Sequence, residues 1–217
     1  IFARTAARFL RFSCACYGAP FYHGWLNNHG EVSSVAKAIR DSTAPQLSNR
    51  QVMTLMTDVP DNDIIECDWK SGEKGRVGTA AYCVCIDRQT RSLVVAFRGT
   101  LDIHDGLRDL CAQGVDFDLA DGLGGKGKVH EGIMGAVVEF DKMLTPRIRA
   151  WMQYDSYGQD FDSVVLCGHS LGAGVASLYH ILLRRAFDGR GAVYDKPTDG
   201  RGDDDDDDDG GGGGGGS

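Results

Sequence analysis

One serine of the chain lies in a sequence pattern that favours nucleophilic chemistry. Ser170 is the central residue of Gly168-His169-Ser170-Leu171-Gly172, which fits G-x-S-x-G. The apolar run 164–167 predicts a buried strand, and the apolar segment after the motif predicts a helix. A serine between such elements lies at the tip of a sharp, strained turn. We therefore expect Ser170 to be a nucleophile, and Gly168 and Gly172 to be the elbow glycines that leave room for the turn.

Two other interpretations of this turn stay open. It could be a glycine-rich connection between a strand and a helix with no chemistry, or a loop that binds phosphate. A phosphate-binding P-loop ends in Lys-Ser or Lys-Thr, and residues 168–174 contain no lysine. The nucleophile hypothesis therefore explains the pattern better.

A serine hydrolase also needs hydrogen-bond donors for the oxyanion, a general base, and an acid that orients the base. One donor is the backbone N–H of the residue after the nucleophile, here Leu171. The second comes from a loop that leaves a neighbouring strand. Thr100 follows the apolar run 92–97, so we expect Thr100 to complete the oxyanion hole. An ordinary strand-ending turn is the alternative for residues 98–100.

The histidines do not supply an evident base. In this architecture the chain order is nucleophile, acid, histidine, and only His180 follows Ser170. Ten residues of helix place His180 roughly 15 Å from the serine, so we expect it on the helix surface. His169 is expected to point away from the nucleophile. Structural or surface roles are expected for the earlier histidines, which are His130, His104, His29 and His23.

The triad Asp and His are accordingly not expected within this chain, although Asp195 and Asp199 remain candidates for the acid. The chain begins at Ile1 rather than methionine, and it ends in runs of aspartate and glycine. We interpret it as a fragment, with residues 1–187 as the N-terminal part of a folded domain. Residues 188–217 are expected to be a disordered acidic and glycine-rich insertion or tail. The fragment alone is expected to be inactive.

The elements that position Ser170 can be predicted from hydrophobic periodicity. An antiparallel hairpin of two strands is expected before the motif, and the second strand is nearly continuous in apolar residues, as is typical of a strand covered on both faces. Residues 41–80 are polar and turn-rich, with one strand near 64–69, and residues 101–129 form a long connection with a short helix near residue 107. The expected helices are 1–17, 32–39, 131–152 and 171–187, and the hairpin strands are 81–86 and 92–97.

The composition excludes several classes of function. The net charge of −8 over 217 residues comes mostly from the aspartate run 203–209, so the remainder is nearly neutral and has no basic field for nucleic acid. No apolar run approaches the roughly 20 residues that span a bilayer. Seven cysteines without a visible signal peptide predict free, mostly buried thiols in a reducing compartment. No metal and no cofactor is expected.

Three stretches resemble the class 3 (fungal-type) lipase family: residues 94–100, 129–132 and 165–174. The stretches similar to the sn-1-specific diacylglycerol lipase branch are Arg98-Gly99-Thr100-Leu101 with residues 105–110, Tyr17-Gly18-Ala19-Pro20-Phe21-Tyr22, and Asp63-Ile64-Ile65. The resemblance as a whole covers about residues 5–187.

The resemblance implies an α/β-hydrolase fold, a central and mostly parallel sheet with flanking helices, here incomplete at the C-terminus. It implies a serine lipase that hydrolyses acyl esters of glycerolipids, diacylglycerol among them, through an acyl-enzyme on Ser170. Thr100 would be an oxyanion residue and residues 101–129 a lid. The family's acid and base lie on later segments. An intracellular, membrane-associated protein is expected, whose partner is a glycerolipid at a lipid interface, with no nucleic acid and no evident protein partner.

Two alternatives to a diacylglycerol lipase stay open. One is a non-catalytic lipid-binding or scaffolding domain that kept the α/β-hydrolase fold. The other is a phospholipase A1 or a soluble esterase of the same fold.

Overall fold

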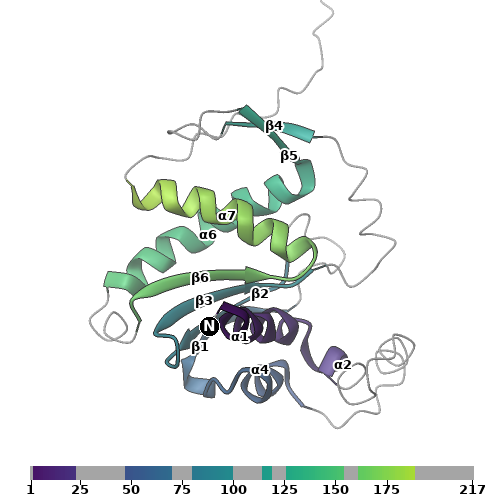
Figure 1. The fold of residues 1–217 in the computed structure, drawn as a ribbon, viewed down its shortest axis with the longest axis vertical. Coiled ribbons are helices and arrows are strands. Elements are labelled where there is room, and N and C mark those ends of the chain that lie inside the picture. Colours follow the sequence, from purple (N-terminus) through teal and green to yellow (C-terminus); the bar gives the residue numbers. More distant parts are fainter. Residues whose placement is uncertain are drawn as a thin grey trace, which may run out of the picture.

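A computed structural model describes residues 2–22, 47–69, 80–99, 114–118, 126–153 and 161–188. These residues form three layers, with a four-stranded sheet between two layers of helices (Figure 1). The helices α1 (Phe2–Ala15) and α4 (Asn49–Thr57) cover one face, and α6 (Glu131–Gln153) and α7 (Leu171–Phe187) cover the other. The short helix α2 (Gly18–Phe21) follows α1.

The sheet is mixed in its described part, with the strand order β1-β2-β3-β6. The strands β1, β2 and β3 are antiparallel neighbours, and β3 and β6 are parallel. Phe97 at the end of β3 is paired with Gly168 at the end of β6, so the turns that follow these two strands leave the sheet side by side. The bounds are Ile64–Asp68 for β1, Tyr82–Asp87 for β2, Ser92–Phe97 for β3 and Ser163–Gly168 for β6.

The predicted hairpin and the three predicted helices that fall on described residues are confirmed. Every residue of β2 and β3 is buried, because helices pack on both faces of these strands. On the α6–α7 face, the rings of Phe97 and Phe140 lie 4.9 Å apart, and those of Phe97 and Tyr179 lie 6.0 Å apart. Aromatic pairs at such distances stabilise a core beyond the area they bury.

One helix and one pair of strands were missed from the sequence. Residues 49–57 form helix α4, capped by a Ser48 hydroxyl that accepts from the Gln51 N–H at 3.2 Å, while the Gln51 side chain accepts from the Ser48 N–H at 2.8 Å. This capping box is a readable helix-start signal. The strands β4 (Gly114–Asp118) and β5 (Lys126–His130) pair antiparallel, where a continuous connection was predicted. The predicted helix at 32–39 and the predicted short helix near residue 107 lie outside the described residues.

The prediction that the cysteines are free thiols is wrong for one pair. Cys67 on β1 and Cys83 on β2 are joined by a disulfide, because they lie directly opposite each other in the antiparallel ladder. Cys14, Cys16, Cys85 and Cys167 are free.

The longest helix, α6, passes through Pro146 without interruption and has 23 residues. Proline removes one backbone hydrogen bond from a helix interior, and packing against α7 and the sheet compensates for that loss. None of the helices in the described part of the chain is long and apolar enough to cross a membrane.

Candidate active site

Ser170 has a backbone conformation that few residues with a side chain adopt. β6 ends at Gly168 and α7 begins at Leu171, so His169 and Ser170 make the whole turn. The φ of Ser170 is 54° and its ψ is −125°, which lies outside the helical, extended and left-handed regions. Such a conformation costs on the order of 1–3 kcal/mol and persists only where the surrounding structure imposes it. The strained turn predicted from the sequence is present, and Ser170 is exposed at its tip.

The two glycines of the motif are required by close backbone contacts. A Cβ on Gly168 would overlap the backbone of Gly172, and a Cβ on Gly172 would lie 2.5 Å from the Phe97 carbonyl oxygen. Atoms this close cannot coexist, so a side chain at either position would push α7 away from the sheet. The glycines therefore let the helix start directly against the ends of β6 and β3.

The turn after β3 touches the turn at Ser170. A Cβ on Gly99 would lie 2.6 Å from the His169 carbonyl oxygen and 3.0 Å from the Ser170 Cβ. Thr100, the expected oxyanion residue, lies outside the described residues. Its neighbour Gly99 lies beside Ser170.

Leu171 is the first residue of α7. The first N–H groups of a helix have no carbonyl partner within the helix. In this turn, the Gly172 N–H is bonded to the His169 carbonyl at 3.0 Å, and the Ala173 N–H to the Ser170 carbonyl at 2.9 Å. Leu171, the expected oxyanion donor, thus lies directly after Ser170 at the start of α7.

His169 and His180 lie as expected. The His169 ring turns toward the N-terminal part of the chain, where its Nδ1 lies 2.9 Å from the Tyr17 hydroxyl, and His180 is exposed on α7. His130 is at the end of β5, and its Nδ1 accepts from the Ile133 N–H at 3.4 Å. No side chain in the described ranges forms a hydrogen bond with the Ser170 hydroxyl. The remaining candidates, His23, His29, His104, Asp195 and Asp199, lie outside those ranges.

Tyr17 forms a contact beside Ser170 that the sequence did not predict. It lies in the turn between α1 and α2, 152 residues before His169, and its ring meets the His169 ring edge-on at 5.8 Å. The only available signal was its place in the Tyr17-Gly18-Ala19-Pro20 stretch, which carries the family resemblance but assigns no role to the tyrosine.

Residues 94–193 match the family described as "Lipase (class 3)". The match begins within β3 and includes the motif at Ser170 and all of α7. The resemblance stated from the sequence is therefore confirmed.

The chain is also similar to individual proteins of this kind. Diacylglycerol lipase-beta from Mus musculus is 28% identical over 187 residues, which cover 82% of this chain and 27% of the mouse protein. The chain thus spans about a quarter of that relative.

Solved lipase structures share the fold. A fungal lipase–inhibitor complex superimposes with a TM-score of 0.55 at 18% identity, covering 86% of this chain and 56% of that one. The Rhizomucor miehei lipase propeptide complex superimposes with a TM-score of 0.53 at 19% identity, covering 87% of this chain and 49% of that one. A triacylglycerol lipase whose catalytic centre is a serine protease triad superimposes with a TM-score of 0.51 at 15% identity, covering 84% of this chain and 57% of that one. The fold is therefore the α/β-hydrolase fold.

The chain also has a hollow of about 390 Å³ beside β6. It is lined by residues of α1, β6 and α7, and Ser170 is not among them. Its lining residues include Phe9, Ser13, Cys167, Ala176 and His180. Within the described residues, β6 is paired on one side only, and no group of three or more His, Cys, Asp or Glu residues is arranged to hold a metal ion.

Proposed function

We propose that the intact protein is a serine ester hydrolase that cleaves acyl esters of glycerolipids, with diacylglycerol as the substrate. The observation that carries this proposal is the strained, glycine-flanked turn at Ser170. The class 3 lipase match supports the reaction class, and the similarity to mouse diacylglycerol lipase-beta supports the substrate.

In the proposed mechanism, Ser170 attacks the ester carbonyl carbon while its proton passes to a general base. The tetrahedral intermediate expels the glycerolipid alcohol, which takes that proton, and leaves the acyl group on Ser170. Water then attacks the acyl-enzyme and releases the fatty acid with the serine restored. The base and its orienting acid come from parts of the protein other than the described residues.

The oxyanion of each tetrahedral intermediate is proposed to bind between Leu171 and Thr100. The Leu171 N–H has no partner within α7, and Gly99 brings the turn after β3 within contact distance of Ser170. Donors that are fixed before the reaction stabilise the developing negative charge without reorganisation. We propose a lipid interface as the place of action; the expected lid, residues 101–129, lies outside the described residues except for its parts in β4 and β5.

A fluorophosphonate probe tests the nucleophile directly. The Ser170 oxygen is expected to displace fluoride from phosphorus, and mass spectrometry of the intact protein's peptides should locate the probe on Ser170. Ser163 and Ser177 are exposed serines on β6 and α7, and they serve as internal controls that should stay unlabelled. Absence of labelling at Ser170 in a folded protein would favour a non-catalytic lipid-binding domain.

The substrate class needs a separate measurement. Hydrolysis of diacylglycerol should rise steeply once the substrate exceeds its solubility and forms an interface. Equal rates on dispersed and aggregated esters would instead identify a soluble esterase, and faster cleavage of a phospholipid than of diacylglycerol would identify a phospholipase.

Gly99→Ala is expected to lower kcat about a hundredfold, because misplacement by about 1 Å at a reacting centre has an effect of that size. The added Cβ would force the turn after β3 away from His169 and Ser170. Gly135→Ala is the matched control, since a Cβ there meets nothing within 4 Å on the α6 surface. The control should keep its kcat and gain about 0.5–1 kcal/mol of stability. Equal kcat values for the two variants would contradict the proposed placement of the oxyanion turn.

A further inference from the structure

The turn between α1 and α2 is firmly attached to the ends of the central strands. Cys16 Sγ contacts the Ala96 carbonyl oxygen on β3 at 3.5 Å. Gly18 has a φ of 75°, which favours glycine, and the Ala19 N–H donates to the Asn49 side chain at 2.9 Å. The backbone around Tyr17 is thus fixed to both β3 and α4.

Tyr17 extends from this turn to the two chain segments that meet at Ser170. Its hydroxyl lies 2.9 Å from His169 Nδ1, beside the nucleophile. The same hydroxyl lies 2.6 Å from the point that a Cβ of Gly99 would occupy, and that point is 3.0 Å from the Ser170 Cβ. The Tyr17 ring is held by Phe21, with ring centres 5.1 Å apart.

The Tyr17 hydroxyl is neutral and has two hydrogen-bond partners. Burial raises the pKa of Tyr17 above its usual value, and a hydrogen bond from the Gly99 backbone lowers it by less. The Gly99 backbone donates to the hydroxyl oxygen, and the hydroxyl also pairs with His169 Nδ1, where the direction of the bond follows the tautomer of the ring. A tyrosine committed to these two partners is neither an acid nor a nucleophile in the reaction.

We propose that Tyr17 is a positioning residue, whose hydroxyl holds the turn after β3 and the turn at Ser170 at the separation that the two oxyanion donors need. The proposal rests on the function proposed above, because that separation matters for catalysis only if Ser170 is acylated. It assigns to the N-terminal segment a direct part in building the active site.

Tyr17→Phe in the intact protein is the test, because it removes the hydroxyl and keeps the ring against Phe21 and His169. We expect kcat to fall roughly tenfold to a hundredfold with little change in KM, since the donors are displaced from the transition state rather than from the substrate. A trifluoromethyl ketone, which forms an oxyanion adduct with the serine, should bind more weakly by the same factor as kcat/KM falls.

Tyr179→Phe is the matched control for the loss of a buried tyrosine hydroxyl. The Tyr179 hydroxyl bonds to Thr145 at 3.0 Å in the α6–α7 interface. This variant should lower the melting temperature and leave kcat and ketone binding unchanged. If Tyr17→Phe behaves in the same way, Tyr17 is only structural and the proposal is overturned.

Amide hydrogen exchange separates this proposal from the proposed function. Tyr17→Phe should accelerate exchange at the Gly99 amide, because that N–H loses its acceptor, and Tyr179→Phe should not. If wild-type protein fails to react with fluorophosphonate, the proposed function fails, and the exchange data still decide whether Tyr17 holds the turn. Unchanged exchange at Gly99 would overturn the proposal even in an active enzyme.

Discussion

Ser170→Ala and Ser170→Gly are both expected to abolish ester hydrolysis, with kcat lower by about a millionfold, as for the loss of a serine nucleophile in other hydrolases. The two inactive variants should nevertheless differ in stability. The Ser170 backbone, with φ 54° and ψ −125°, is strained for any residue that has a Cβ. Glycine adopts this conformation without a steric penalty, so the glycine variant should be the more stable one.

The expected difference between the two variants is about 1 kcal/mol. The strain amounts to on the order of 1–3 kcal/mol, and the greater freedom of glycine in the unfolded chain offsets about 0.4–1 kcal/mol of this. For a chain of this length, the difference corresponds to about 2–4 °C in melting temperature. Thermal unfolding and hydrolysis, measured on the same preparations, check both parts.

The comparison distinguishes a functional turn from a structural one. A serine kept only for packing could be replaced by glycine with a gain in stability and no loss of activity. If Ser170→Gly keeps measurable turnover, the nucleophile is another residue. If the glycine variant is less stable than the alanine variant, the strain inferred from the backbone angles is not present in solution.

The parts of this site that the sequence predicted are those encoded locally. The motif at Ser170 lies within five consecutive residues, and the apolar runs of β3, β6 and α7 are continuous. Short or polar elements were missed, such as α4, whose buried residues are only Val52, Met53 and Thr57. The 9-residue length of α4 gives too few periods for a strong amphipathic signal.

Contacts between distant segments could not be predicted from one sequence. The Cys67–Cys83 pairing depends on the register of β1 against β2, which shifts between Ile64 and Glu66. The contact between Tyr17 and His169 depends on how α1 lies against β3 and β6. The local hydrophobic pattern predicts neither the register between two strands nor the position of a helix on the sheet, so both are seen only in the folded structure.

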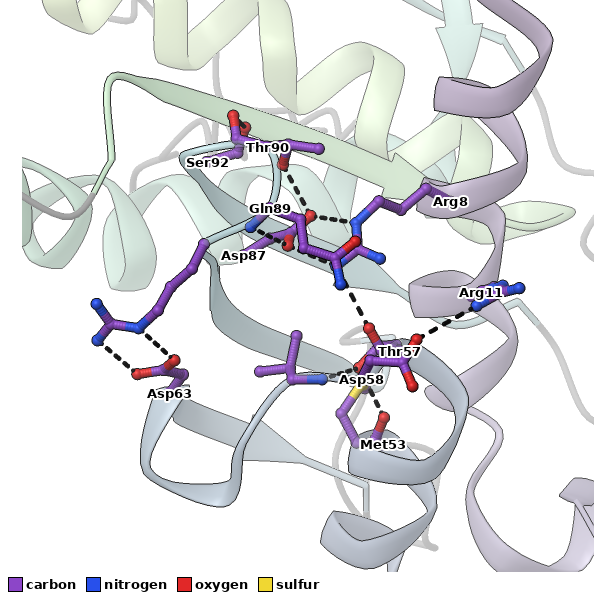
Figure 2. A network of polar contacts seen from close by, with 12 residues as sticks. Arg8, Arg11, Met53, Thr57, Asp58, Asp63, Asp87, Gln89, Thr90 and Ser92 are labelled. Carbon is purple, nitrogen blue, oxygen red and sulfur yellow. Dashed lines mark hydrogen bonds and ion pairs between the residues drawn. The ribbon is translucent and has the colours of Figure 1, made fainter.

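Asp87→Asn is expected to lower the free energy of unfolding by about 3 kcal/mol or more, as when one partner of a buried ion pair is removed. Asp87 accepts from Arg8 Nε at 2.6 Å and from the Thr90 hydroxyl at 2.7 Å (Figure 2). The Asp87 side chain is 1% exposed and that of Arg8 is 14% exposed, so the substitution leaves a charge in the protein with no counter-ion. Urea unfolding at pH 7 measures the loss, which is a large share of the roughly 5–15 kcal/mol of a typical domain.

The same pair should make stability depend on pH. Burial raises the pKa of Asp87, but hydrogen bonds from Arg8 and Thr90 outweigh it, and the net pKa is lowered. A carboxyl whose pKa is lower in the folded protein contributes stability above its unfolded pKa and loses it as the pH falls through the folded value. The wild-type protein should therefore lose stability below about pH 4, and Asp87→Asn should lack that part of the loss.

Asp162→Asn is the control, because it breaks a similar ion pair in an exposed setting. Asp162 accepts from Arg91 Nε at 2.6 Å, and both side chains are more than half exposed. Solvent screens such a pair, so little change in stability is expected although the pKa of Asp162 is also lowered by Arg91. If the two variants lose equal stability, burial does not strengthen the Arg8–Asp87 pair. If only Asp87→Asn is destabilised, that pair fixes α1 to the hairpin of β2 and β3, and with it the helix that leads to Tyr17.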